Sequence, residues 1–121
     1  MSNPISKICA ILKDFYSHQS KSITQLFNES GYVEKPELVT KESLIEHLTT
    51  NPNLVKEWEN YSSDKRVGQG WYFIKDKSQW TVGYSSVPSQ ERRQTFASAF
   101  EACAEFIIHE LREWAEHVTR S

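Results

Sequence analysis

The first sixty residues carry apolar side chains at the three- and four-residue steps of amphipathic helices. These steps predict one helix over residues 4–18, with Asn3 as its N-cap and Pro4 at its first position. A second apolar segment ends at Gly31, where a left-handed C-terminal residue is expected, and Pro36 is expected in an extended connection. Two more helices are predicted, one from near Thr40 and one after Asn51-Pro52. The positions expected to face the core are Ile5, Ile8, Cys9, Leu12, Phe15, Ile23, Leu26, Phe27, Leu44, Ile45, Leu48, Leu54, Val55, Trp58 and Tyr61.

From residue 70 the apolar pattern changes to the alternation typical of strands. Residues 71–74 and 80–84 are rich in aromatic and β-branched side chains, and residues 75–79 form a polar connection between them. Alternation with period two predicts a half-buried strand, so the two runs predict a β-hairpin. Residues 92–96 are expected to add a third, short edge strand.

The last part of the chain has the strongest helical pattern. Ser98 and Glu101 have the spacing of a capping box, and apolar residues then recur over residues 99–118. The fold class is therefore α+β, with N-terminal helices followed by a three-stranded antiparallel meander packed against a long C-terminal helix. We expect one domain over residues 1–121, with a helical part at about 1–62, the meander at about 70–97 and the last helix at about 99–118. Trp80 and Phe100 are expected in its core.

The composition agrees with one folded domain. The chain has 121 residues, of which 38% are hydrophobic and 12% aromatic, so a disordered or low-complexity segment is excluded. The N-terminus has no secretory pattern, and no window has the apolar length of a membrane span, so a cytoplasmic location without membrane association is expected. Cys9 and Cys103 lie in apolar helical stripes and are expected to be buried reduced thiols, with a disulfide between the first and last helices as the alternative.

The sequence lacks the spacings that catalysis and metal binding usually need. His109-Glu-Leu-Arg-Glu113 has glutamate where a zinc protease needs a second histidine. His109, Glu113 and His117 lie four residues apart, which suits a solvated charged stripe better than a metal site. The glycine pattern at residues 68–70 lacks the features of a dinucleotide turn. We therefore expect a binding protein rather than an enzyme, with no cofactor.

Charge is distributed unevenly along the chain. The formal net charge is −2, but residues 1–60 carry −2, residues 61–97 carry +3 and residues 98–121 carry −3. Within residues 29–59, seven glutamates face three lysines. This imbalance suits an ordinary solvated helix surface, or an anionic surface that steers a cationic partner toward it. On the second interpretation, the candidate partner-binding residues are Glu42, Glu46, Glu57 and Glu59.

The C-terminal half resembles a known family. Gly70-Trp-Tyr-Phe-Ile74, Trp80-Thr-Val-Gly-Tyr84, Thr95-Phe-Ala-Ser-Ala-Phe-Glu-Ala-Cys103 and Phe106-Ile-Ile-His-Glu-Leu111 follow one another in this order. This layout resembles the immunity proteins of bacterial polymorphic-toxin systems, which include contact-dependent growth inhibition systems. The resemblance covers residues 70–111 only. Ser85-Ser-Val-Pro88 stands where that layout often has an acidic residue and a glycine.

The resemblance implies an antitoxin-like inhibitor without an activity of its own. Such a protein binds the C-terminal domain of a toxin, here expected to be a basic, nuclease-like domain, and blocks its active site or substrate surface. The main alternative is a small nucleic-acid-binding module that uses a basic, aromatic hairpin. A small enzyme with an unrecognised site is a third hypothesis. The residues of the hairpin alternative are Lys65, Arg66, Lys75, Lys77, Arg92 and Arg93 around Trp71, Tyr72, Trp80 and Tyr84.

Overall fold

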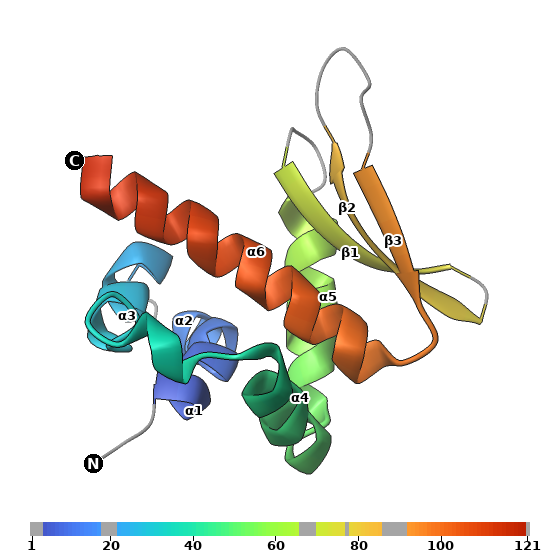
Figure 1. The fold of residues 1–121 in the computed structure, drawn as a ribbon, viewed down its shortest axis with the longest axis horizontal. Helices are drawn as coiled ribbons and strands as arrows, with labels where there is room; N and C mark the ends of the chain where they lie inside the picture. Colours follow the sequence, from blue (N-terminus) through green and yellow to red (C-terminus); the bar gives the residue numbers. More distant parts are fainter. Residues whose placement is uncertain (1–3, 18–21, 66–69, 77, 86–91, 121) are drawn as a thin grey trace.

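Helices precede and follow a small sheet, in the order that the sequence predicts (Figure 1). The computed structural model describes residues 4–17, 22–65, 70–76, 78–85 and 92–120. Asn3, His18 and residue 66 therefore lie outside the described residues, as do the side chains of Lys65, Lys77, Arg92, Arg93 and His117. The elements are α1 (Pro4–Cys9), α2 (Ile11–Ser17), α3 (Ile23–Glu29), η1 (Pro36–Leu38), α4 (Lys41–Thr50), α5 (Asn53–Lys65), β1 (Gly70–Asp76), β2 (Gln79–Ser85), β3 (Arg92–Phe96) and α6 (Ala99–Arg120).

The sheet is an antiparallel meander in the order β1-β2-β3, which confirms the predicted α+β class. Phe73 is paired with Val82, and Trp80 is paired with Phe96, so these side chains share one face. The long helix α6 packs on that face, where the rings of Phe73 and Phe106 lie 5.8 Å apart. Pairing of β1 with β2 continues to Asp76 and Gln79, so the connection predicted over residues 75–79 is largely strand.

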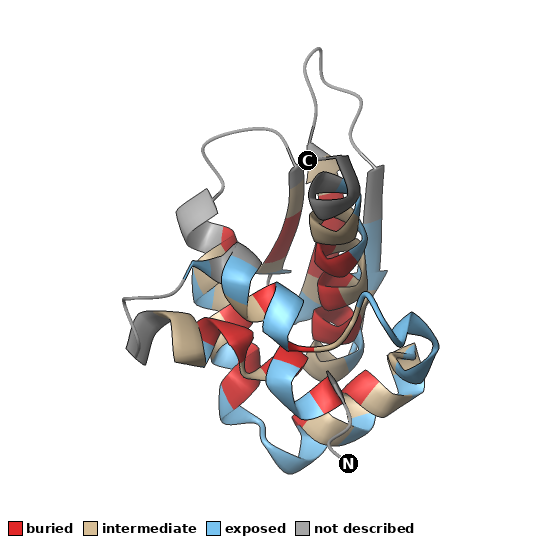
Figure 2. Cartoon of the chain, turned by 90° about the vertical axis from the view of Figure 1, so that its left-hand side faces the viewer, coloured by how far each residue is buried: buried red, intermediate tan, exposed pale blue. Residues whose placement is uncertain are grey.

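The core lies between the N-terminal helices, α5, α6 and the sheet. The central turns of α6 are buried on the side that meets the other elements (Figure 2). The fully buried aromatic side chains among the described residues are Phe27, Trp58, Phe73 and Phe106. Trp80 and Phe100, predicted as core residues, are only half-buried and pack against its rim. Trp80 is the second residue of the central strand β2 and Phe100 is the second residue of α6, and a large ring at the end of an element has too few neighbours to be covered completely.

The first predicted helix is broken in two. The prediction of one helix over residues 4–18 is wrong, because α1 ends at Cys9 and α2 begins at Ile11. The Trp58 indole Nε1 of α5 donates a hydrogen bond of 3.0 Å to the Cys9 carbonyl. This carbonyl thereby pairs with a side chain instead of a helical N–H, and the chain turns at Ala10 while its apolar period continues.

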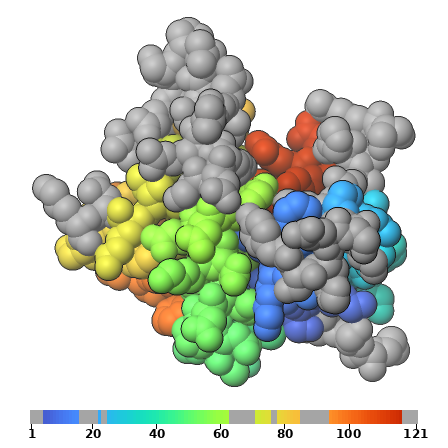
Figure 3. Space-filling model, turned by 180° about the vertical axis from the view of Figure 1, so that it is seen from behind, coloured from blue at the N-terminus to red at the C-terminus, as the bar shows by residue number. Residues whose placement is uncertain are grey.

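The outer edge of β1 is covered by a helix. Ser62 of α5 is fully buried, and its Oγ accepts a hydrogen bond of 2.7 Å from the Phe73 backbone N–H. An outward-facing N–H of an edge strand is normally left to solvent or to another strand. Seen from behind, α5 reaches the surface between the sheet and the N-terminal helices (Figure 3). The hydroxyl therefore ties the sheet to the helical part of the molecule.

Three local predictions have separate outcomes. Gly31 has a φ of 86°, which confirms the left-handed position after α3. Pro36 is not extended but begins the short helix η1, since its fixed φ suits a first helical position. Only the Ser98 half of the predicted capping box forms among the described residues: Ser98 Oγ accepts from the Glu101 N–H at 3.4 Å, whereas the Glu101 carboxylate lies 3.9 Å from Lys41 Nζ.

Candidate functional site

Helix α4 presents two acidic side chains on one exposed surface. It begins with a capping box in which Thr40 Oγ1 accepts from the Ser43 N–H at 3.1 Å and Ser43 Oγ accepts from the Thr40 N–H at 3.0 Å. Leu44 and Leu48 are fully buried. That orientation leaves Glu42 and Glu46 exposed, one helical turn apart. Among the described residues, neither carboxylate has an ion pair or a hydrogen bond, so both are available to a partner.

The other two predicted glutamates do not form one surface with each other. Glu57 and Glu59 are both half-buried and flank Trp58, the core residue of α5. Residues two positions apart in a helix point about 200° away from each other, so the two carboxylates leave α5 on opposite sides. Glu59 lies close enough to Cys103 for its charge to help raise the pKa of that thiol. At most one of the two can extend the acidic surface of α4.

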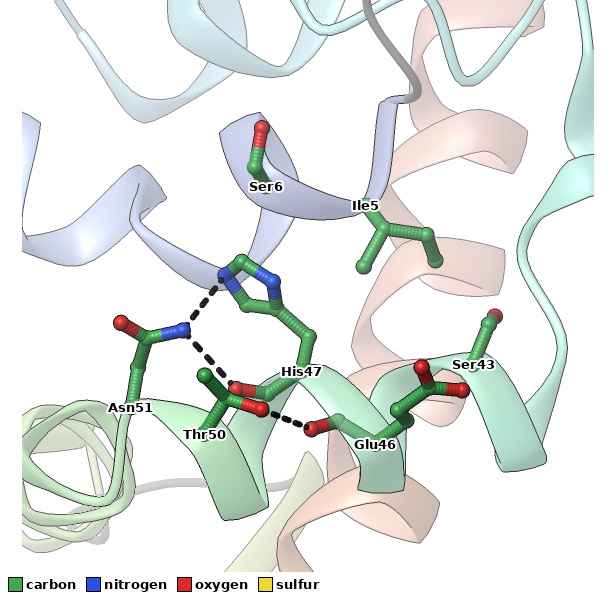
Figure 4. Close-up of a pocket in the computed structure, with 7 residues that line it drawn as sticks. All are labelled: Ile5, Ser6, Ser43, Glu46, His47, Thr50 and Asn51. Carbon is green, nitrogen blue, oxygen red and sulfur yellow. Dashed lines mark hydrogen bonds between the residues drawn. The ribbon is translucent and has the colours of Figure 1, made fainter.

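An open groove lies between α1 and α4, with a volume of about 390 Å³. Ile5 and Ser6 line it from α1, and Ser43, Glu46, His47 and Thr50 line it from α4, with Asn51 at the end of that helix. Figure 4 shows Ile5 and His47 pointing into the space between the helices, with Glu46 and Ser43 toward one end and Asn51 toward the other. One of the four predicted glutamates, Glu46, therefore belongs to a concave site.

Hydrogen bonds hold most polar groups of this groove in place. Asn51 Nδ2 donates to the His47 carbonyl at 3.0 Å and lies 3.5 Å from His47 Nε2. Thr50 Oγ1 donates to the Glu46 carbonyl at 3.1 Å, and Ser43 Oγ donates to the Thr40 carbonyl at 2.9 Å. These bonds use backbone and neutral partners. The carboxylate of Glu46 is thus the charged group that the groove leaves without a described partner.

The sequence pattern contained part of this site. Residues 43, 46, 47, 50 and 51 have the spacing of one helical face, so α4 alone could have been assigned this surface. The opposite wall could not, because the contact of α1 with α4 joins segments about forty residues apart in the chain, and single-sequence periodicity does not report such contacts.

A second charged cluster links α4, α6 and the sheet. Lys41 Nζ lies 3.3 Å from Glu105 Oε1 and 5.1 Å from the centre of the Phe96 ring. Glu105 Oε2 lies 2.8 Å from His109 Nε2. The imidazole of His109 stacks on Trp71, with ring centres 3.6 Å apart and planes at 3°. Because these groups satisfy one another, the cluster fastens elements together and leaves few sites for a partner.

The predicted solvated stripe of His109, Glu113 and His117 is wrong at His109. Its side chain is only 17% exposed, and its partner is Glu105, one turn before it, rather than Glu113. Burial lowers the pKa of His109, and the opposing effect of Glu105 is smaller. In the part of the chain that the structure describes, no group of three His, Cys, Asp or Glu side chains is arranged to hold a metal ion.

One buried carboxyl group escaped the sequence analysis. Glu110 of α6 is 1% exposed and has an interaction partner. Its burial could have been predicted from the sequence, because it follows Ile107 by three residues and precedes Leu111, on the apolar side of the helix. A carboxyl group at such a position is normally paired, and it fixes α6 more than it recognises a partner.

The two cysteines are free and buried, as predicted. Burial raises the pKa of Cys9 to about 12, and the pKa of Cys103 is raised well above its ordinary value mainly by burial. A thiol that stays protonated is a poor nucleophile and a poor metal ligand. The cysteines therefore belong to the core.

The aromatic side chains of the hairpin are used mainly by the fold. Trp71 stacks on His109, and Trp80 stacks on Phe73 with ring centres 5.3 Å apart. Lys75 Nζ lies 5.7 Å from the Trp80 ring centre, so this described cation already has an aromatic neighbour. A stacking platform for bases needs open ring faces. Nothing in this arrangement favours the nucleic-acid alternative.

The comparisons with known proteins do not assign this chain to a class. No known protein family, curated protein or solved structure matches it. Among the described helices, none combines the length and apolar character needed to cross a membrane. The α4 surface with Glu42 and Glu46, together with the adjoining groove, is therefore the candidate site.

Proposed function

We propose that this chain is an immunity-type inhibitor that binds a cognate toxin domain and blocks its active site or substrate surface. The observation that supports this proposal best is the pair of exposed carboxylates of Glu42 and Glu46 beside the groove, which have no ion pair or hydrogen bond with any described residue. Nuclease domains carry basic surfaces that hold phosphate groups, and an acidic protein surface is complementary to them. Inhibition by occlusion needs a rigid surface and no catalytic group.

The packing of the molecule also suits an inhibitor. Helix α4 is fixed by its capping box, by two buried leucines and by the ion pairs of Lys41 with α6. A surface that is held before binding loses little conformational entropy when a partner docks. The resemblance over residues 70–111 lies in β1 to α6, the part against which α4 packs. That part is the scaffold, and α4 is the contact surface.

A bacterial growth assay, followed by a binding measurement with the two purified proteins, tests the proposal. The proposal predicts that the reading frame directly upstream of this chain encodes a large secreted protein, and the C-terminal domain of that protein is the partner to test. We expect its expression to arrest bacterial growth, co-expression of this chain to restore growth, and the purified pair to bind with a Kd on the order of nanomolar. A toxic upstream domain that this chain neither binds nor neutralises would overturn the proposal, as would a neighbouring frame without any such domain. Salt-sensitive binding of RNA by the chain alone would support the nucleic-acid alternative instead.

A further inference from the structure

The groove between α1 and α4 is electrically unbalanced. Its described lining holds hydroxyl and amide groups, the imidazole of His47, the apolar side chain of Ile5 and one carboxylate, that of Glu46. Glu46 is exposed, and its carboxylate lacks a described ion pair or hydrogen bond. The nearest cation on the same helix, Lys41, is engaged with Glu101 and Glu105 of α6. The groove therefore favours a positively charged group and disfavours an anion.

The polar groups of the groove also indicate the shape of that cation. Asn51 Nδ2 donates to the His47 carbonyl at 3.0 Å and lies 3.5 Å from His47 Nε2, so these two side chains fix one end of the groove next to each other. Ser43 lies at the same end of the groove as Glu46, and its hydroxyl oxygen is on the side of that carboxylate (Figure 4). A hydroxyl acceptor beside a carboxylate suits a planar group with several donors better than a compact ammonium.

We propose that this groove binds the side chain of a single arginine supplied by a protein partner. The guanidinium lies against the Glu46 carboxylate in a forked pair, and its methylene groups lie along Ile5. A groove of about 390 Å³ accommodates one such side chain. This inference rests on the proposed function, in which the arginine belongs to the basic surface of the toxin domain.

A metal ion is a poorer occupant of the same groove. Glu46 supplies the one carboxylate of the described lining, and His47 Nε2 lies 3.5 Å from Asn51 Nδ2. No described set of three metal-ligating side chains lies here or elsewhere in the described residues. A guanidinium needs only one carboxylate and neutral acceptors around it.

The test uses the full chain and small probes, so it does not depend on the toxin. Two-dimensional ¹H–¹⁵N NMR correlation spectra of the chain are recorded while N-acetyl-arginine amide is added. N-acetyl-citrulline amide serves as the neutral probe of nearly the same shape. We expect arginine amide to shift the amide signals of Ser6, Glu46, His47 and Asn51 with a Kd on the order of millimolar. Citrulline amide should cause shifts at least fivefold smaller.

Two matched variants distinguish binding of arginine amide in the groove from its general electrostatic attraction to the acidic surface of α4. Glu46→Gln and Glu42→Gln each remove one charge from the same exposed helix, but only Glu46 lines the groove. Glu46→Gln should weaken arginine amide binding at least fivefold, whereas Glu42→Gln should leave it within twofold. Equal effects of both variants, equal binding of both probes, or shifts scattered over the surface would overturn the inference. If the chain neutralises the toxin but does not bind arginine amide, the arginine site is rejected and the proposed function stands. If the chain binds arginine amide but does not neutralise the toxin, the proposed function is rejected and the arginine site stands.

Discussion

His109 shows how a single residue can be shared between two kinds of contact. Its imidazole stacks on Trp71 at 3.6 Å, and its Nε2 lies 2.8 Å from Glu105. Burial removes water from the ring and favours the neutral form, whereas Glu105 and Glu113 favour the charged form and Arg112 opposes it. The balance lowers the pKa of His109, so the folded chain prefers a neutral imidazole that donates to Glu105.

This balance predicts how stability depends on pH. Because the folded chain binds the His109 proton less readily than the unfolded chain, its contribution to stability is complete above about pH 6.5 and is lost as the pH falls below it. We expect the free energy of unfolding to fall more between pH 7.5 and pH 5.5 in the native chain than in His109→Gln, measured by urea denaturation. The variant keeps a donor toward Glu105 and lacks the titration. A smaller fall in the native chain would mean that Glu105 and Trp71 outweigh burial.

Helix α6 joins the sheet to the other helices, but its apolar residues do not contribute equally. Phe106 is fully buried, and its ring lies 5.8 Å from that of Phe73 and 6.1 Å from that of Trp58. Phe100 is half-buried at the start of the same helix. Position within the element therefore decides what each ring contributes to stability.

The two phenylalanines form a matched pair for a stability test. Phe106→Ala should lower the free energy of unfolding by about 3–5 kcal/mol, because it leaves a cavity at the centre of the core. Phe100→Ala should cost about 1–2 kcal/mol, since solvent already reaches part of the ring. Chemical denaturation followed by far-ultraviolet circular dichroism measures both. Losses of equal size would show that the border of α6 is packed as tightly as its centre.

Elements with their own local signals could be predicted from the sequence. The bounds of β3 and the start of α6 agree with the prediction, because period, turn residues and a cap act within a few positions. The break at Ala10 could not be predicted, since the bond that accompanies it comes from Trp58, 49 residues after Cys9. The apolar residues keep their helical spacing from α1 into α2. This spacing therefore predicts which side is buried, but it does not predict that the helix is interrupted at Ala10.

The candidate site was predictable only in part for the same reason. The exposure of Glu42 and Glu46 follows from the buried side of α4, which the leucine spacing indicates. A similar argument applied to α5 would have separated Glu57 from Glu59, because they flank Trp58. The second wall of the groove depends on how α1 packs against α4, and that is a property of the tertiary structure.

At the scale of the whole molecule, a small net charge conceals separate charged regions. The total is −2, yet residues 61–97 carry +3 and the segments on either side are acidic. Surface charges act mainly over about a Debye length, roughly 8–10 Å at physiological salt. A basic partner therefore responds to the local charge of α4 rather than to the total. This is why we expect the position of each glutamate to matter more than the number of glutamates.

Charge reversal tests that expectation with two variants of equal net charge. Each Glu→Lys change adds two positive charges, so Glu42→Lys/Glu46→Lys and Glu57→Lys/Glu59→Lys both take the chain from −2 to +2. We expect the α4 pair to slow association with the toxin domain by about tenfold or more at low salt, because it reverses the field of one continuous surface. The α5 pair should slow association less, since its side chains leave the helix on opposite sides. Stopped-flow mixing at two salt concentrations measures the rates, and unfolding curves establish that both variants remain folded. Equal slowing by the two pairs would show that the partner responds to net charge, and unchanged rates in the α4 pair would remove that surface from the interface.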